Sequence, residues 1–245
     1  EVGKAMSEYN REGKVHYYED KETAMQSMVD KWMRDKEQIS GESQIMLAYK
    51  REDVRKLNEE ARKELKGCCK LGRGHEYDLS NGKREMSIGD QVYFLRNDNG
   101  LEVKNGTLGE VVSADKEGNI SINVKDRENY RKVSFNIDKY NYIDHGYAAT
   151  VHKAQGITVD KAYVMASKGF NQHITYVAMS RHIKDVNLYW SRDEFGSFSN
   201  LKNHMGREAR KENAMDYIDS AKEYAKDRGI ESTYKNIDVK NNEFH

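Results

Sequence analysis

The chain has 245 residues, of which 37% are hydrophobic and 33% are charged. Its 41 basic residues balance 41 acidic ones, which excludes a nucleic-acid binder that is basic over its whole surface but leaves room for a local basic groove. Six Phe, sixteen Tyr and two Trp supply enough aromatic mass for a packed core, so wholesale disorder is not expected.

Several absences in the sequence bear on its location. No apolar run approaches the ~20 residues that a membrane-spanning helix needs, and the amino terminus has no signal-peptide pattern. Cys68 and Cys69 are neighbours in the sequence, so they make poor disulfide partners and lack a metal-chelating spacing. We therefore expect a cytoplasmic protein with no metal site and no membrane partner. Because the first residue is Glu rather than Met, we also expect the sequence to be part of a longer chain.

The first part of the chain has the pattern of a parallel α/β domain. Apolar residues at helical spacing over 20–36 predict a helix that packs on a sheet, with a Met-rich binding groove as the alternative. The apolar run 43–50 predicts a buried strand, and it leads directly into a charged amphipathic helix over 51–67 that ends at Gly67. Strand, tight turn and helix form the repeating unit of such domains.

The pattern changes between about residues 86 and 145, where short strand-like segments alternate with turn sequences. These turns place Asn and Gly where a positive φ is favoured. Strands at roughly ten-residue spacing predict a small β-barrel inserted into the α/β domain. The strands are predicted over 91–96, 109–115, 119–125 and 130–136. From about residue 196 the chain turns polar and predicts one or two exposed helices.

A polar corner lies between two strand-like stretches in the second half of the chain. Binding sites in open α/β sheets lie at the carboxyl ends of strands, and a helix beginning here would offer free backbone N–H groups to a phosphate. Thr150, His152 and Lys153 would add donors and charge, and Gln155 followed by Gly156 would let the main chain approach a ligand closely. The alternative is that the small residues only pack while His152 and Lys153 are solvated.

A second stretch, residues 174–190, predicts a helix, a short polar turn and a strand. Tyr176, Val177 and Met179 are expected to pack, and Arg181 follows near the end of the helix, where its guanidinium would project toward a neighbouring domain. An arginine supplied to a γ-phosphate raises turnover ~10³–10⁵-fold in phosphoryl-transfer enzymes. The alternative is an ordinary surface arginine.

Three stretches in the order IMLAYKREDVRKLNEEAR, YAATVHKAQG and TYVAMSR, with the predicted insertion between the first two, resemble motifs IV, V and VI of the second motor domain of RecD-like superfamily-one helicases. The resemblance is greatest to the helicase part of TraA-type conjugative relaxases. It implies an α/β fold, a RecA-like parallel-sheet domain with an inserted small SH3-type β-barrel and a helical C-terminal tail. The implied parts are the first motor segment with the motif IV region (1–84), the SH3-like barrel (85–144), the second motor segment with motifs V and VI (145–195) and the polar helical tail (196–245).

The resemblance implies roles on the nucleotide side. Arg181 would be the arginine finger on ATP bound between two motor domains, and Gln155 would be the second catalytic residue. Gln155 and Gly156 would couple the nucleotide to the DNA, and Gly156, Arg51 and Tyr176 would contact the nucleotide.

On the DNA side the resemblance implies contacts with a single strand from three places. They are Thr150, His152 and Lys153 of motif V, Tyr49 and Lys50 of the motif IV region, and Asn97 and Asn105 of the barrel, next to Gly106. Arg51 would lie at the same motif IV end of the DNA or nucleotide cleft. For Asn105 and Gly106, a simple turn is the alternative.

The sequence has no G-x-x-x-x-G-K-[ST] loop and no convincing Walker B acidic pair. ATP and Mg²⁺ would then be bound mainly by an upstream motor domain, and the chain is not expected to be an ATPase alone. The predicted function is the C-terminal motor half of an ATP-dependent, single-strand-translocating DNA helicase of a conjugative relaxase. Its partners would be single-stranded DNA and the N-terminal motor and relaxase domains of the same protein. Two alternatives stay open, a non-catalytic nucleic-acid-binding remnant and an interaction module that uses the polar tail.

Overall fold

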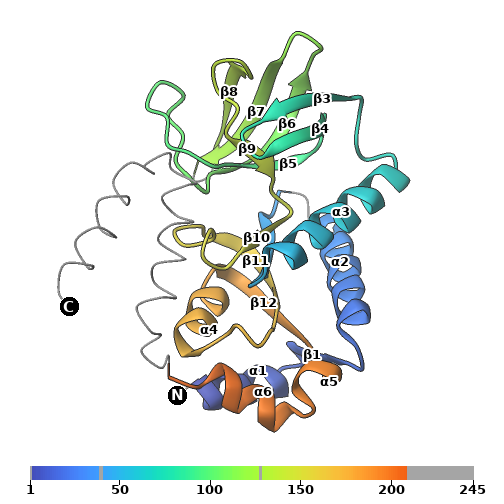
Figure 1. Ribbon diagram of the computed structural model, residues 1–245, viewed down its shortest axis with the longest axis vertical. Helices are drawn as coiled ribbons and strands as arrows, with labels where there is room; N and C mark the ends of the chain where they lie inside the picture. The colour runs from blue at the N-terminus through green and yellow to red at the C-terminus, as the bar shows by residue number, and fades with distance from the viewer. Residues whose placement is uncertain (1, 39–40, 127–128, 209–245) are drawn as a thin grey trace, which may run out of the picture. The chain divides into compact units, whose positions relative to one another are not determined.

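The computed structural model describes residues 2–38, 41–126 and 129–208 (Figure 1). One part of the fold is a five-stranded sheet in the order β1-β12-β11-β2-β10, and all its neighbouring strands are parallel. Its inner strand β2 is buried along its whole length, β11 is buried except at Lys161, and β12 is buried from Val186 onward, as expected for a parallel sheet covered on both faces. The strands are β1 (Val15–Tyr18), β2 (Gln44–Ala48), β10 (Ala148–Thr150), β11 (Val159–Met165) and β12 (His182–Ser191).

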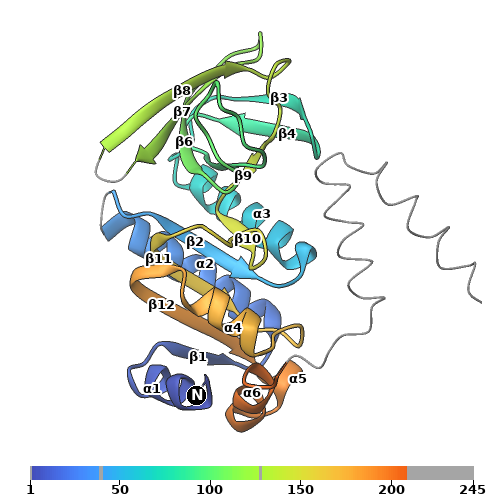
Figure 2. The same ribbon diagram turned by 90° about the vertical axis from the view of Figure 1, so that its left-hand side faces the viewer.

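Helices cover the two faces of this sheet (Figure 2). On one face, α2 and α3 bury Trp32 and Leu57 against Tyr163 of the sheet. On the other face, α4 packs together with α1, α5 and α6. The helix predicted over 20–36, the strand over 43–50 and the helix over 51–67 are confirmed. None of the described helices is both long and apolar enough to cross a membrane. The helices are α1 (Val2–Arg11), α2 (Lys21–Gln38), α3 (Arg51–Gly67), α4 (Gln172–Met179), α5 (Arg192–Phe195) and α6 (Phe198–Met205).

The inserted segment is antiparallel and confirms the four predicted strands, to which the structure adds three others. A five-stranded sheet has the order β8-β7-β6-β5-β9, and β3 and β4 form a separate hairpin. The described pairings leave β8 and β9 as outer strands, so an SH3-type barrel is not confirmed. The predicted boundaries after residues 84 and 144 fall inside β4 and β9, and the domain limits stay a prediction. The strands are β3 (Gly74–Leu79), β4 (Gly82–Ser87), β5 (Gln91–Phe94), β6 (Leu108–Ala114), β7 (Asn119–Asp126), β8 (Asn129–Asn136) and β9 (Ile143–His145).

The start of the predicted exposed tail belongs to the core instead. Helix α6 buries Leu201 and Met205 completely, because their four-residue spacing puts both on one face of the helix. The expectation of exposed helices from residue 196 is therefore wrong for α6. The remainder of the predicted tail, 209–245, lies outside the described residues.

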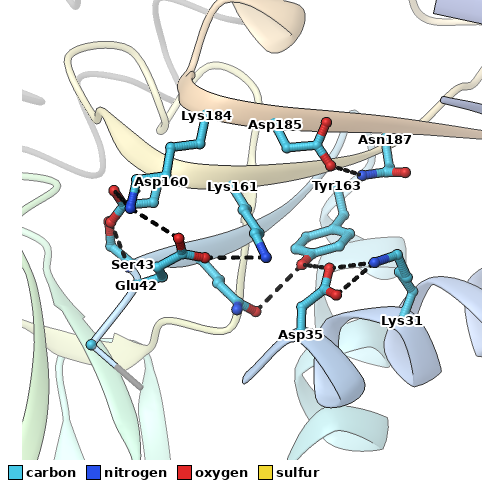
Figure 3. A network of polar contacts seen from close by, with 12 residues as sticks. Lys31, Asp35, Glu42, Ser43, Asp160, Lys161, Tyr163, Lys184, Asp185 and Asn187 are labelled. Atoms are coloured by element: carbon cyan, nitrogen blue, oxygen red, sulfur yellow. Dashed lines mark hydrogen bonds and ion pairs between the residues drawn. The ribbon is translucent and has the colours of Figure 1, made fainter. Parts of the chain in front are cut away.

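Figure 3 shows a polar network at the amino edge of the parallel sheet, in which Asp160 lies beside Ser43 and Lys184. A contact from Asp160 to Lys125 joins this sheet to the inserted one. Asp160 accepts hydrogen bonds from the Ser43 N–H and hydroxyl, both at 2.8 Å, and pairs with Lys125 of β7 at 3.1 Å and Lys184 at 3.3 Å. Burial favours a raised pKa for Asp160, but the Ser43 and lysine contacts outweigh it and hold the pKa well below its usual value. The Lys125–Asp160 pair therefore anchors the inserted sheet to β11 as a charged pair.

A second polar cluster joins helix α3 to the hairpin and β5. Arg62 of α3 contacts Asp90 (Nε–Oδ1 3.1 Å), Glu85 (Nη1–Oε2 3.1 Å) and the Ser87 hydroxyl (2.9 Å). Lys66 adds a contact of 2.8 Å to Glu85. Since Asp90 is fully buried and Arg62 is largely so, this cluster fixes the inserted segment to α3.

Acidification is expected to weaken this junction through Glu85. Lys66 and Arg62 lower the pKa of Glu85 from 4.5 to about 2. A lowered folded-state pKa stabilises the fold above the unfolded-state pKa, and this contribution disappears as the pH falls towards about 2. Because the side chain is 42% exposed, solvent screening limits the contribution to about 1 kcal/mol. Urea unfolding should show that the unmodified chain has a larger free energy of unfolding than Glu85→Gln near neutral pH. This difference should decrease as the pH falls towards about 2. A constant advantage would contradict the assignment.

Candidate functional site

The predicted DNA-side residues of motifs IV and V meet at the carboxyl edge of the parallel sheet. Strands β2 and β10 end side by side at Ala48 and Thr150, and the Val151 N–H donates to Ala48 O at 3.0 Å. This pairing brings Tyr49 next to His152, with 5.7 Å between the ring centroids. Tyr49 is half-buried and His152 is exposed. An aromatic pair therefore lies at the open end of two parallel strands.

Basic side chains border the aromatic pair. Lys50 is the N-cap of helix α3 and Arg51 is its first residue, and both are exposed. Lys153 follows His152 and is half-buried. Sequence position thus places three cations next to Tyr49 and His152. The combination suits a polyanion whose bases can stack on a ring.

The motif V loop has a different backbone from the one expected. Residues 151–156 form successive turns, so the expectation of a helix beginning here is wrong. Thr150 is buried, its hydroxyl accepts from the Lys153 N–H at 3.2 Å, and its carbonyl accepts from the Ala154 N–H at 3.0 Å. Gly156, at φ +90°, lies within these turns, in a conformation that favours glycine over a continued helix. Because these N–H groups donate within the loop, side chains must supply most contacts to a ligand.

The nucleotide-side residues form a second group at the other end of the same crossover. Arg181 lies between α4 and β12, and its Nη1 donates to Ile157 O at 3.4 Å, just after Gln155 and Gly156. Gln155 and Gly156 are both exposed, and a Cβ built on Gly156 would meet nothing within 4 Å. Since Arg181 precedes β12, this group lies toward the amino edge of the sheet. The crossover 151–158 therefore links the two groups.

Two residues of the nucleotide prediction lie differently. Tyr176 is 68% exposed on α4, so the expectation that it packs is wrong. It occupies the solvent side of a helix whose other face fills the core, next to buried Thr175 and Val177. Arg51 follows the carboxyl end of β2, at the edge opposite Arg181. The structure therefore groups Arg51 with Tyr49 and Lys50.

The inserted segment contributes a turn that contacts the motif V loop. The Asn105 N–H donates to the Asn97 side-chain oxygen at 2.7 Å, and Gly106 has φ +88°. A Cβ on Gly106 would lie 3.1 Å from the Ile157 side chain and 3.9 Å from Lys153 O. The turn is therefore present, and it brings exposed Asn97 and Asn105 to the crossover.

Asn58 of α3 is a site residue that sequence reasoning missed. Its amide accepts from the Ala148 N–H at 2.9 Å and donates to Ala148 O at 3.1 Å, so it completes the outer edge of β10. An asparagine in a charged helix carries no motif that would reveal this contact across 90 residues. Helix α3 thereby fixes β10, the strand at the start of motif V.

Gly169 and Phe170, in the loop after β11, were missed as well. The Phe170 ring lies 6.4 Å from the Tyr49 ring, and the Gly169 backbone lies directly against that ring. The glycine among polar residues after a strand signals a loop, but nothing in the sequence connects it to Tyr49.

The described residues contain no cluster of three or more His, Cys, Asp or Glu side chains placed to hold a metal ion. The groups that suit a nucleotide are instead a guanidinium, an amide, an exposed tyrosine ring and an open glycine backbone. They belong to Arg181, Gln155, Tyr176 and Gly156.

Comparison with known proteins identifies relatives over nearly the whole chain. The chain is 37% identical over 234 residues to the conjugal transfer protein TraA of Agrobacterium fabrum, covering 94% of this chain and 21% of that protein. It is also 37% identical over 216 residues to a probable TraA of Sinorhizobium fredii, covering 88% of this chain and 19% of that protein. The chain thus spans about a fifth of the length of these relatives. No protein-family model matches it.

A solved structure supports the fold. The Pif1 helicase of Candida albicans matches with a TM-score of 0.52 and 17% identity, covering 80% of this chain and 57% of that one. At this identity the likeness concerns the fold alone. The sequence relatives, at 37% identity over most of the chain, show that the chain belongs to the family of TraA-type conjugal transfer proteins.

Proposed function

We propose that this chain is the second motor domain of an ATP-driven helicase that moves along single-stranded DNA during conjugal transfer. The observation that supports this most is the crossover 151–158, which has a basic, aromatic group at one end and Arg181 at the other. A translocating motor needs such a connection, because changes at the nucleotide must reach the DNA. We propose further that the inserted segment is of the SH3 type and that residues 1–84 and 145–195 form the motor domain around it.

At the DNA end, Lys50, Lys153 and His152 would contact the backbone of the strand, and Tyr49 would stack against a base. Thr150 would act through its hydrogen bond to the Lys153 N–H, which sets the turn that presents that lysine. Asn97 and Asn105 would extend the same surface from the inserted segment.

At the nucleotide end, Arg181, Gln155, Gly156 and Tyr176 would face ATP and Mg²⁺ held mainly by the first motor domain of the same protein. Hydrolysis of the bound ATP would supply the free energy for movement along the strand. The Arg181 guanidinium would contact the γ-phosphate. Gln155 would couple changes at the nucleotide to Lys153, because both residues lie in the same loop. Arg51, which follows Tyr49 and Lys50 after the carboxyl end of β2, would serve the DNA end.

Replacing Lys153 with alanine tests the DNA end. Fluorescence anisotropy of a labelled single-stranded oligonucleotide, titrated with this chain over a range of salt concentrations, should show weak, salt-sensitive binding. Lys153→Ala should weaken it for every sequence and flatten the salt slope by ~0.7, since one phosphate contact is lost. Lys83→Ala, which removes an exposed lysine of β4, is the matched control and should leave the slope unchanged. An unchanged slope in Lys153→Ala, or no binding by the unmodified chain at low salt, would contradict the proposal.

A further inference from the structure

The Tyr49 ring lies in a space that exists only because residue 169 has no side chain. A Cβ built on Gly169 would lie 2.1 Å from Cδ1, 2.2 Å from Cε1 and 2.7 Å from Cγ of that ring. These are far shorter than any real Cβ contact, so ring and side chain cannot both occupy the space. The backbone of Gly169 does not have a positive φ, so an alanine there meets no conformational obstacle of its own.

The loop that carries Gly169 is held on its other side. Lys168 N–H donates to Glu194 Oε1 at 2.7 Å. Lys168 O accepts from His204 Nε2 at 2.7 Å and from Arg207 Nη2 at 3.0 Å, both at or beyond the end of α6. The backbone on the amino side of Gly169 is therefore fixed by three contacts.

The carboxyl side of the loop is fixed too. Phe170 is fully buried, and its N–H donates to Ser167 O at 3.0 Å. Asn171 caps α4 by accepting from the Ile174 N–H at 2.9 Å. Since the loop is anchored on both sides and Tyr49 is half-exposed, a side chain at residue 169 would displace the ring rather than the loop.

We propose that Gly169 is a positioning residue of the DNA site, which sets the place of the Tyr49 ring beside His152 and so the stacking surface for a nucleobase. This inference rests on the proposed function, and it adds to it a residue 120 positions from Tyr49 in the sequence. Through Lys168, it also makes α6 the support of that stacking surface.

A double-mutant cycle tests the proposal, with single-stranded DNA affinity measured for the unmodified chain, Gly169→Ala, Tyr49→Ala and the double variant. Each single change should weaken binding by ~5- to 150-fold, the loss expected when one base no longer stacks. The double variant should bind no more weakly than Tyr49→Ala, because Gly169 acts only through that ring. Neither change should alter the salt slope, since no phosphate contact is lost. Gly67→Ala is the matched control, because a Cβ there meets nothing within 4 Å, and it should bind like the unmodified chain.

The outcomes separate this proposal from the proposed function. Unmodified binding by Gly169→Ala, additive losses in the double variant, or a flattened salt slope would overturn the positioning role while leaving Lys153 as evidence for DNA binding. Unmodified binding by Tyr49→Ala would overturn it as well. Failure of the unmodified chain to bind would overturn both. If Gly169→Ala does not fold, thermal unfolding of the double variant Tyr49→Ala/Gly169→Ala tests the proposal instead. A midpoint equal to that of Tyr49→Ala supports it, because the added Cβ then clashes only with the ring. An unfolded double variant overturns it.

Discussion

Replacing Arg181 with alanine in a complete two-domain protein is expected to cut ATP turnover by ~10²-fold or more while leaving single-stranded DNA affinity nearly intact. The reason is that an arginine on a γ-phosphate stabilises charge that develops only during phosphoryl transfer. Steady-state ATPase rates and oligonucleotide anisotropy, measured on the same preparations, give both quantities.

The structure explains why this side chain suits the role. The Arg181 guanidinium donates to Val177 O at 2.8 Å, to the Ser180 hydroxyl at 3.0 Å and to Ile157 O at 3.4 Å. It is thus held at the carboxyl end of α4, where a positive charge is favoured. Among the described residues these contacts use one N–H on each nitrogen, and each terminal nitrogen has a second N–H for an incoming phosphate.

Two companion variants sharpen the Arg181 result. Arg181→Lys keeps the positive charge but loses the planar guanidinium with its paired N–H donors, so its ATP turnover should also be strongly reduced. Arg55→Ala removes an exposed arginine of α3 and should change neither quantity. Near-normal ATP turnover in Arg181→Ala would contradict the assignment of Arg181 as the arginine finger. A complete motor with no ATP turnover but normal DNA binding would instead favour the non-catalytic remnant.

The features that sequence predicts correctly are those encoded over short distances. The buried strand Gln44–Ala48 followed by an amphipathic helix is visible in one continuous stretch, because hydrophobic period and capping are local. The turn at Asn105 and Gly106 was predicted for the same reason, and its positive φ is observed. Tyr49 and His152 lie close together for a similar reason, since they come just after strands β2 and β10, which pair side by side. That these residues contact DNA stays a prediction.

The features that sequence missed depend on contacts between distant segments. The solvent side of α4 cannot be told from its buried side in a helix this apolar, so Tyr176 was placed in the core. The loop after β10 contains good helix formers, yet its turns close on the Thr150 hydroxyl and carbonyl instead. The contacts of Asn58 with Ala148 and of Gly169 with Tyr49 join residues far apart in the sequence, and no local pattern encodes them.

Removing the Arg62 side chain is expected to destabilise the fold by about 3–5 kcal/mol, the cost of leaving a buried charge without its partner. Asp90 is fully buried, and Arg62 meets both of its carboxylate oxygens, at 3.1 Å and 3.2 Å. Urea unfolding of Arg62→Ala measures the loss, and Arg55→Ala, whose ion pair with Glu59 is exposed, should change stability by less than about 0.5 kcal/mol.

The source of this expected loss can be tested by neutralising the carboxylate. If the uncompensated charge is responsible, Asp90→Asn should restore part of the stability of Arg62→Ala, whereas simple loss of packing would leave the double variant no better. Asp90 also accepts hydrogen bonds from the Tyr147 hydroxyl and from the Ser87 N–H at 2.6 Å. Tyr147 is the first residue of motif V and immediately precedes β10, so the same carboxylate connects α3, the hairpin and motif V. Arg62→Ala should therefore weaken single-stranded DNA binding as well as stability. Normal DNA affinity in this variant would contradict a role for Asp90 in positioning motif V.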